Sequence, residues 1–257
     1  MELFEIIILI AGGFFCGILN TLAGFGSVIS LAIYMDVLNI PGHIANATNR
    51  VNILASSNIA AATFYKNGKL KLKGDALFIV ATLIGAIVGA VIASYVNDAQ
   101  FRTAFKYLLI PILILLIANP KKFMNVLENE KPASPWIMLP MLFIIGIYAG
   151  FIQAGFGVLF LMILVMLGRY NLVRSNALKT AIVAIYSFFV VGWFWWKGMI
   201  NWQPGLIMAI GQSISGYLTA KYLSKYENAN RFAYWFLIVL LILVIVKNFK
   251  LYEYLDM

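Results

Sequence analysis

Long apolar stretches separated by short polar turns follow one another along almost the whole chain. Stretches of this length with few charges are typical of membrane-spanning helices, which need about 20 residues to cross a bilayer. Eight are present, at residues 6–34, 44–65, 76–96, 101–118, 136–167, 172–196, 204–222 and 232–246. The longest polar break, residues 119–135, carries several charges and three prolines and is predicted to be a linker. The pattern predicts an all-α polytopic membrane protein.

The two parts on either side of this linker repeat each other. Ala23-Gly24-Phe25-Gly26 recurs as Ala154-Gly155-Phe156-Gly157, and Asn46-Ala47 recurs as Asn176-Ala177. Each Gly-Phe-Gly motif lies near the centre of an apolar stretch of about 30 residues, which is too long for a single crossing. We therefore expect repeat 1 over residues 1–118, a cytoplasmic linker over 119–135 and repeat 2 over 136–257. Duplicated halves with a Gly-interrupted apolar segment indicate a transporter whose site lies between the repeats.

Two topologies are compatible with these over-long segments. Each segment either crosses once as a kinked helix, giving parallel repeats, or enters and returns on one side as a re-entrant hairpin, giving inverted repeats. Lys and Arg gather on the cytoplasmic side of a membrane protein. Full crossings divide the nineteen Lys and Arg residues ten against nine, whereas hairpins gather thirteen on one side. These are Lys66, Lys69, Lys71, Lys73, Lys121, Lys122, Lys131, Arg169, Arg174, Lys179, Lys221, Lys225 and Arg231. The predicted fold is two inverted repeats, each a Gly-broken re-entrant hairpin plus three transmembrane helices.

Composition supports the membrane assignment and narrows the partners. Hydrophobic residues make up 63% of the 257 and charged residues 11%, and the mean hydropathy is +0.91, which leaves too little polar surface for a soluble domain. The lipid bilayer is the expected partner, and self-association into a homo-oligomer stays open. The net charge of +9 is accounted for by the loops, so nucleic acid is not an expected partner. Cys16 is the single cysteine and is expected to be a small packing residue.

The glycines predict an anion site. Glycine permits a sharp break in a helix, and the returning half-helix then begins with backbone N–H groups that have no partner within it. Such a terminus attracts anions through these donors and through the helix dipole. Two such ends meeting near the middle of the bilayer would bind an anion between Gly24, Gly26, Gly155 and Gly157. The alternative is that these glycines only allow close helix packing.

A small set of polar residues near the two breaks supplies the remaining candidates. Amide groups precede each break, and polar residues including one cation open the following helix of each half. A charge within a bilayer is costly enough to suggest function, although both cations are also close enough to the helix ends to reach the head groups. The full set of expected substrate-binding residues is Asn20, Gly24, Phe25, Gly26, Thr48, Asn49, Arg50, Gln153, Gly155, Phe156, Gly157, Asn176 and Lys179.

The acidic residues and the single histidine argue against other chemistries. All ten carboxylates fall in termini, loops or segment ends, and His43 lies in a Pro-Gly turn. A proton relay built on Asp or Glu, a metal site and a two-carboxylate hydrolase are therefore disfavoured. We expect no catalytic residue, no metal and no cofactor.

With the doubled Ala-Gly-Phe-Gly core, each followed by an Asn-Ala helix start at Asn46 or Asn176, the chain resembles the sulfite exporter TauE/SafE family over almost its entire length. The resemblance implies a multi-pass protein of the prokaryotic cell membrane that moves sulfite, sulfoacetate or other organosulfonates. Family members often carry more glycines at the break, where this chain has Ser27 and Val158. We expect a secondary transporter, an exporter of such oxyanions by alternating access. The alternatives are a transporter of another small anion such as a carboxylate, and a non-transport membrane enzyme.

Overall fold

The computed structural model describes residues 1–22, 24–70, 72, 74–118, 133–222 and 227–249. Ala23, most of the expected linker and the last eight residues of the expected second repeat lie outside the described residues. The described part is helical and contains no strand. Its helices are α1 (Leu3–Leu22), α2 (Gly26–Ala32), α3 (Gly42–Lys66), α4 (Ala76–Ala93), α5 (Asp98–Ala118), α7 (Pro135–Phe151), α8 (Phe156–Met162), α9 (Leu172–Trp196), α10 (Trp202–Lys221) and α11 (Glu227–Asn248).

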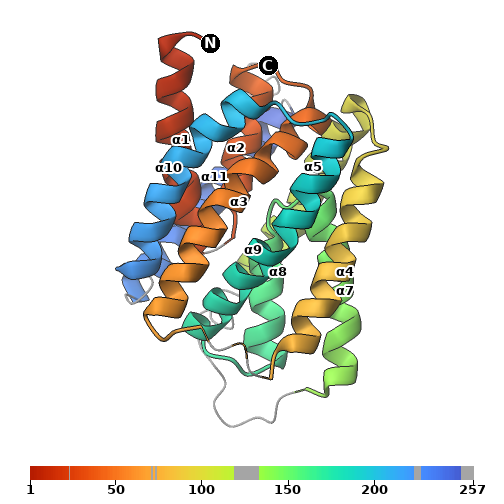
Figure 1. Cartoon of the computed structure of the whole chain (residues 1–257), viewed down its shortest axis with the longest axis vertical. Helices are drawn as coiled ribbons and strands as arrows, with labels where there is room; N and C mark the ends of the chain where they lie inside the picture. The colour runs from red at the N-terminus through yellow and green to blue at the C-terminus, as the bar shows by residue number, and fades with distance from the viewer. Residues whose placement is uncertain (23, 71, 73, 119–132, 223–226, 250–257) are drawn as a thin grey trace.

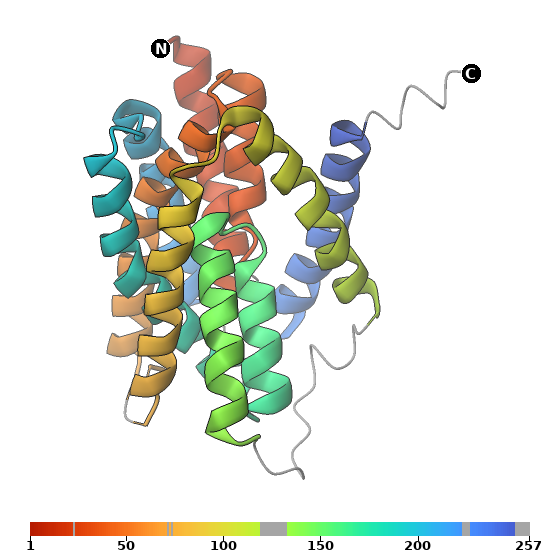
Figure 2. The ribbon, with the colours of Figure 1, turned by 90° about the vertical axis from the view of Figure 1, so that its right-hand side faces the viewer.

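Each over-long apolar segment is broken at its Gly-Phe-Gly motif. The first is divided between α1 and α2, and the second between α7 and α8. Both short helices continue into one π-helical turn, η1 (Ile33–Val37) after α2 and η2 (Ile163–Leu167) after α8. In Figures 1 and 2, α1 runs down from the N-terminus and α2 returns upward, whereas α7 runs upward and α8 returns downward.

Helices of the two halves pack crosswise. The first helix of each half packs on a later helix of the other half, α1 on α10 and α7 on α4. α10 also packs on α3, and α4 on α9, while α3 contacts α9. We divide these helices into two groups, α1–α3–α10 and α4–α7–α9, which meet along α3 and α9; Figure 1 shows α1 and α10 on one side of the molecule and α4 and α7 on the other. α5 and α11 pair with each other beside these groups.

Glycines bring the backbones of the crosswise pairs into direct contact. On α4, a Cβ at Gly89 would overlap the carbonyl of Ile147 on α7, and one at Gly85 would overlap that of Phe143. Between α1 and α10, a Cβ at Gly17 would overlap Ser215 and the carbonyl of Gln212. Small residues at helix contacts are the usual way for membrane helices to gain van der Waals packing.

Gly89→Leu is expected to separate α4 from α7 and destabilise the protein. Overpacking a tight contact costs about 1–3 kcal/mol or more, and here the obstacle is backbone rather than a flexible side chain. The measurement is the thermal unfolding temperature of the purified protein in detergent. Gly192→Leu on α9 is the matched control, because no heavy atom lies within 4 Å of a Cβ at Gly192. Equal unfolding temperatures of the two variants would contradict the close α4–α7 contact.

Three described helices are long and apolar enough to cross a membrane, namely α1, α4 and α9. α3 has the length, with 25 residues, but carries many polar residues. Most of these are buried inside the protein, including Asn46, Thr48, Asn49 and Asn52. The mean hydropathy of α3 is lowered by these inward-facing polar residues, although they are not exposed on its surface.

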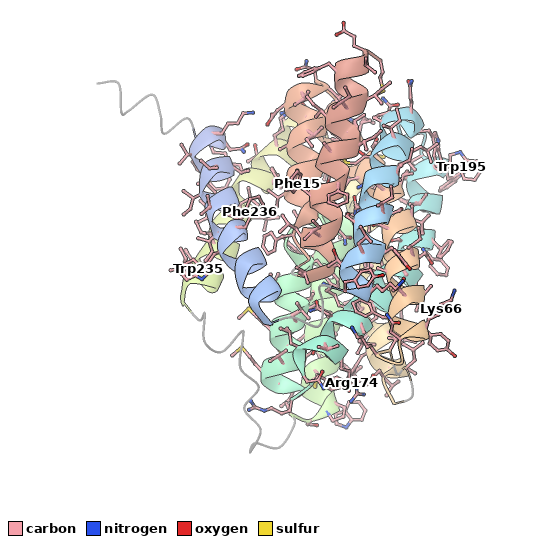
Figure 3. The ribbon with its side chains drawn as sticks, turned by 90° about the vertical axis from the view of Figure 1, so that its left-hand side faces the viewer. Phe15, Lys66, Arg174, Trp195, Trp235 and Phe236 are labelled. Carbon is pink, nitrogen blue, oxygen red and sulfur yellow. The ribbon has the colours of Figure 1, made fainter. Side chains whose placement is uncertain are left out.

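Charged and aromatic side chains gather at the two ends of the molecule. Figure 3 shows Lys66 and Arg174 toward one end and Trp195 nearer the other. At the first end, the buried carboxylate of Asp75 accepts hydrogen bonds from the Tyr170 hydroxyl (2.5 Å) and from Arg174 Nη2 (3.1 Å). Burial and the hydrogen bond to Asp75 raise the pKa of Tyr170 to about 12. This cluster fastens the turn before α4 to the turn before α9.

Candidate functional site

The two helix breaks meet face to face in the middle of the molecule. Gly24 and Gly155 have the positive φ angles of 77° and 80° that the sequence predicts for the breaks, and Gln153 also has a positive φ of 61°. A Cβ on Gly24 would overlap the Cα of Gly157 and would lie 2.8 Å from its backbone nitrogen. The approach of the two chains therefore depends on the absence of a side chain at Gly24.

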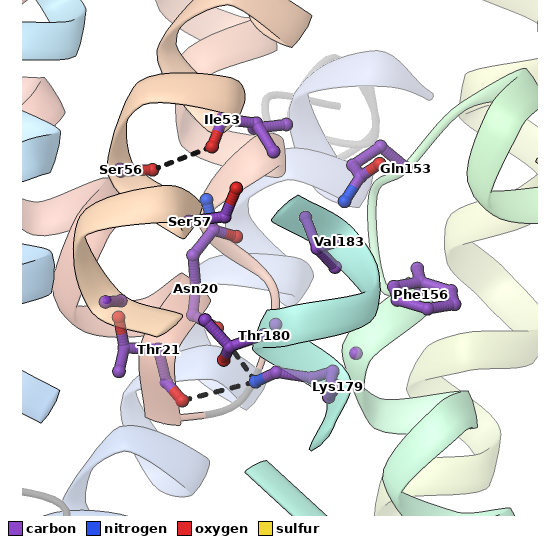
Figure 4. Close-up of a pocket in the computed structure, with 13 residues that line it drawn as sticks. Asn20, Thr21, Ile53, Ser56, Ser57, Gln153, Phe156, Lys179, Thr180 and Val183 are labelled. Carbon is purple, nitrogen blue, oxygen red and sulfur yellow. Dashed lines mark hydrogen bonds between the residues drawn. The ribbon is translucent and has the colours of Figure 1, made fainter. Parts of the chain in front are cut away.

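A cavity of about 30 Å³ lies beside this contact (Figure 4). Its volume is enough for about two water molecules. It is bounded by the end of α1, one face of α3, the second break and one face of α9. The lining residues are Asn20, Thr21, Gly24, Ile53, Ser56, Ser57, Ala60, Gln153, Phe156, Gly157, Lys179, Thr180 and Val183. Lys179 is the single charged residue among them, and no Asp or Glu is present.

Lys179 reaches the cavity from α9 and holds the end of α1. Its side chain is 2% exposed, and its ammonium group donates to the carbonyl oxygens of Asn20 (2.9 Å) and Thr21 (3.2 Å). A third bond goes to Asn176 Oδ1 at 2.9 Å. The last carbonyls of a helix have no partner within it and carry its negative dipole end. Lys179 satisfies those of α1, as Figure 4 shows for Thr21.

Arg50 makes the corresponding contact in the other direction, from α3 to the end of α7. Its guanidinium group donates to the carbonyl oxygens of Ala149 (2.7 Å) and Gly150 (2.8 Å) and to Gln153 Oε1 (2.5 Å). Asn46 Oδ1 accepts a further bond at 3.3 Å. Each cation therefore binds the C-terminal end of the broken helix of the opposite half. Because α1 and α3 belong to one helix group and α7 and α9 to the other, both cations join the two groups.

Six of the thirteen residues expected from the sequence line the cavity: Asn20, Gly24, Gln153, Phe156, Gly157 and Lys179. The other seven do not, namely Phe25, Gly26, Thr48, Asn49, Arg50, Gly155 and Asn176. Gly26 packs on the Cys16 carbonyl and the Asn20 side chain, and Thr48 Oγ1 accepts from the Asn201 amide at 3.0 Å. These seven residues form the surroundings of the cavity rather than its wall.

Four polar residues of the cavity wall are missing from the expected set: Thr21, Ser56, Ser57 and Thr180. Asn49, Asn52 and Ser56 follow one another at spacings of three and four residues, which puts the three on one side of a helix. That spacing is the signal that identifies Ser56 in the sequence. Thr180 is adjacent to Lys179 and belongs to the same polar helix start.

A buried chain of hydrogen bonds extends from Ser56 within the α1–α3–α10 group. Gln212 Nε2 on α10 donates to Ser56 Oγ (2.9 Å), and Gln212 Oε1 accepts from Asn52 Nδ2 (2.5 Å). The Tyr34 hydroxyl of η1 donates to Asn52 Oδ1 at 3.0 Å. These bonds tie η1, α3 and α10 together. The aligned positions of the second half, such as Val165 opposite Tyr34 and Ile182 opposite Asn52, are apolar.

The arrangement suits reversible binding of a small anion. Amide and hydroxyl groups on several elements surround one buried cation, and a negative charge beside it would be attracted more strongly than in bulk water, because the surroundings have a low dielectric constant. Among the described residues, no group of three or more His, Cys, Asp or Glu side chains is positioned to hold a metal ion.

Comparison with known proteins identifies relatives over most of the chain. The family described as "Sulfite exporter TauE/SafE" matches residues 9–247. The probable membrane transporter protein ORF9 of Sinorhizobium sp. is 24% identical over 215 residues, which cover 83% of this chain and 81% of that protein. The probable membrane transporter protein YfcA of Escherichia coli K12 is 25% identical over 209 residues, 80% of this chain and 76% of that protein. No solved structure matches the chain.

Proposed function

Because the chain belongs to the sulfite exporter TauE/SafE family and is a membrane transporter by that membership, we propose that it exports small sulfur-containing oxyanions such as sulfite or organosulfonates. Its expected place is the cell membrane of a prokaryote. The observation that carries the proposal is the cavity between the two helix breaks, which contains Lys179, several neutral hydrogen-bond donors and no carboxylate. A site with this charge favours an anion and disfavours a cation.

The oxyanion binds beside Lys179 and the meeting point of Gly24 and Gly157. Its oxygens accept hydrogen bonds from the amides of Asn20 and Gln153, which line the cavity. The Ser57 and Thr180 hydroxyls also line it; they donate to carbonyls of their own helices in this state and turn toward the anion when it binds. The half-helices that begin at Gly26 and Phe156 follow the two breaks, which meet at Gly24 and Gly157, and their dipoles add to the positive field. Arg50 contributes by holding Gln153 and the end of α7 in position.

The transport cycle is alternating access at a site on the interface of two inverted repeats. The opposite courses of α1 and α7 and of α2 and α8 support this topology. Because the helices pack crosswise, the bodies that move against each other are the α1–α3–α10 and α4–α7–α9 groups rather than the two halves of the sequence. Lys179 and Arg50 join these bodies, together with Asn46, whose Nδ2 donates to the Phe151 carbonyl of α7 at 2.8 Å. The cavity has room for about two waters in the present state, so loading an oxyanion requires the bodies to separate at one tie.

The substrate itself provides the means of releasing Lys179. In the present state this ammonium group binds carbonyl oxygens of Asn20 and Thr21. A charged oxyanion is a stronger acceptor than a neutral carbonyl, so an anion entering the cavity competes for Lys179 and weakens the tie to α1. Binding and opening are thereby coupled through one side chain.

Thermal unfolding of the purified protein against a panel of anions tests this function. A ligand that binds only the folded state raises stability by RT ln(1 + [L]/Kd), about 2.7 kcal/mol at a hundred times Kd. We expect sulfite, thiosulfate or sulfoacetate to raise the unfolding temperature, with uptake of the same labelled anion into inside-out vesicles as the second readout. If a carboxylate raises the unfolding temperature and no sulfur oxyanion does, the transported substrate is a carboxylate instead. If no anion stabilises the protein and none is taken up by the vesicles, anion transport is refuted.

A further inference from the structure

The outer side of the α3–α10 pair is hollowed where these two helices end. A groove of about 390 Å³ is lined there by Ile59, Ala62, Thr63, Lys66, Asn67, Tyr217 and Lys221. Lys66 is the last residue of α3 and Lys221 the last of α10, so two cations stand at the same end of one apolar groove. Among the residues that the structure describes, no Asp or Glu lines the groove. Figure 3 shows Lys66 at this end of the molecule.

The surroundings of the groove place it at the level of lipid head groups. Tyr65, Tyr217 and Tyr222 are 69%, 39% and 50% exposed around the two lysines, and exposed tyrosines are typical of the membrane–water interface. Lys221 Nζ donates to the Tyr217 hydroxyl at 2.9 Å and lies 5.2 Å and 5.0 Å from the Tyr217 and Tyr222 ring centres. Further along, Ile59 and Ala62 offer an apolar surface to hydrocarbon.

Other grooves on the described lipid-facing surface lack this combination. The groove beside α11 contains Lys247, but its ammonium group is paired with Asp36 at 2.7 Å. The grooves over α4 and α7 and over α1 are lined by apolar residues with no cation. Of these four grooves, the α3–α10 groove is the one that offers an anionic phosphate cations not paired with a carboxylate.

We propose that the α3–α10 groove binds an anionic phospholipid. Its phosphate lies between Lys66 and Lys221, with Asn67 and the Tyr217 hydroxyl as further polar partners, and one acyl chain lies along Ile59 and Ala62. The site is separate from the central cavity, which lies on another face of α3 at Ser56, Ser57 and Ala60. The lipid holds α3 and α10 together at their ends, and this role does not depend on the identity of the transported substrate.

Lipid-dependent thermal stability tests the proposal. The protein in detergent is titrated with phosphatidylglycerol and, separately, with phosphatidylcholine, and the concentration that gives half of the stabilisation is measured. Each lysine near an anionic lipid contributes about a fivefold change in affinity, so the double variant Lys66→Gln/Lys221→Gln is expected to need about 25-fold more phosphatidylglycerol. Phosphatidylcholine should stabilise both proteins alike. Ala62→Trp, which fills the groove at an exposed position without changing charge, should also weaken the response.

A control variant distinguishes a specific lipid site from general electrostatic attraction between the protein and anionic lipid. Lys106→Gln/Lys197→Gln removes two lysines from other parts of the surface, the half-buried Lys106 and the exposed Lys197, and should leave the phosphatidylglycerol response unchanged. If the control loses as much of its phosphatidylglycerol response as the double variant of the groove, the lipid is attracted by the overall positive charge of the protein and the proposed site is refuted. Inorganic phosphate that replaces the lipid would overturn it in favour of a soluble anion. No difference between the two lipids would also refute it.

Discussion

Gly24→Ala is expected to abolish transport, whereas Gly68→Ala is expected to leave it close to the wild-type rate. Both glycines have a positive φ, 77° at Gly24 and 68° at Gly68, so alanine at either position costs about 1–2 kcal/mol of backbone strain. Only at Gly24 does the new Cβ also overlap the backbone of Gly157. That overlap adds about 1–3 kcal/mol of overpacking and pushes the two breaks apart where the cavity is formed.

Transport of the anion identified by the stability panel, normalised to the amount of folded protein in the membrane, measures the difference. Gly68 is the appropriate comparison because no heavy atom lies within 4 Å of a Cβ at that glycine, so the variant reports the dihedral strain alone. If Gly24→Ala transports as well as Gly68→Ala, contact between the two breaks has no part in the mechanism.

Lys179→Gln is expected to lower the affinity for the transported anion about 100-fold or more. Two unit charges 4 Å apart attract each other by about 4 kcal/mol at an effective dielectric constant of 20, and about 2.8 kcal/mol corresponds to a factor of 100. Glutamine keeps a donor for the α1 carbonyls, so the variant removes the charge while retaining part of the helix cap. The measurement is the anion concentration required for half-maximal thermal stabilisation.

Two control variants test whether the lower anion affinity is specific to Lys179. Lys197→Gln removes a cation that lies over the rings of Trp193 and Trp196 on the surface and should bind the anion as the wild type does. Arg50→Gln removes a cation that binds α7 but does not line the cavity. This variant should therefore lower the unfolding temperature more than it lowers the affinity for the anion. A Lys179→Gln protein with unchanged anion affinity would show that Lys179 is only a helix cap.

The division of roles between Arg50 and Lys179 could not be predicted from the sequence. Alignment of the two halves pairs Asn49 with Lys179 and Arg50 with Thr180, so the two cations differ by one register position. Side chains at successive positions of a helix point in directions that differ by about 100° around its axis. Lys179 and Thr180 line the cavity from α9, whereas Asn49 and Arg50 on α3 do not. A sequence pattern gives the spacing of these residues, but the facing direction depends on how each helix is rotated against its neighbours.

The crosswise packing of helices from the two halves could not be predicted from the sequence either. The sequence suggests two halves separated at the linker, yet α1 packs on α10 and α7 on α4. These partners are far apart along the chain, and the glycines that allow their contact, such as Gly17 and Gly89, occur within apolar runs where several packing partners are possible. Pairing of membrane helices is decided by shape and close backbone contact, and neither is visible in hydropathy.

By itself the sequence determined the class of the protein and the location of its breaks. Membrane residence follows from composition, and the two breaks follow from glycines in apolar runs too long for one crossing, since both are local properties of the chain. The tertiary structure alone decided that the breaks touch through Gly24 and Gly157, that Lys179 rather than Arg50 lines the cavity between them, and that Ser56 and Ser57 complete its wall. These features depend on contacts between residues more than a hundred positions apart, which only the packed helices bring together.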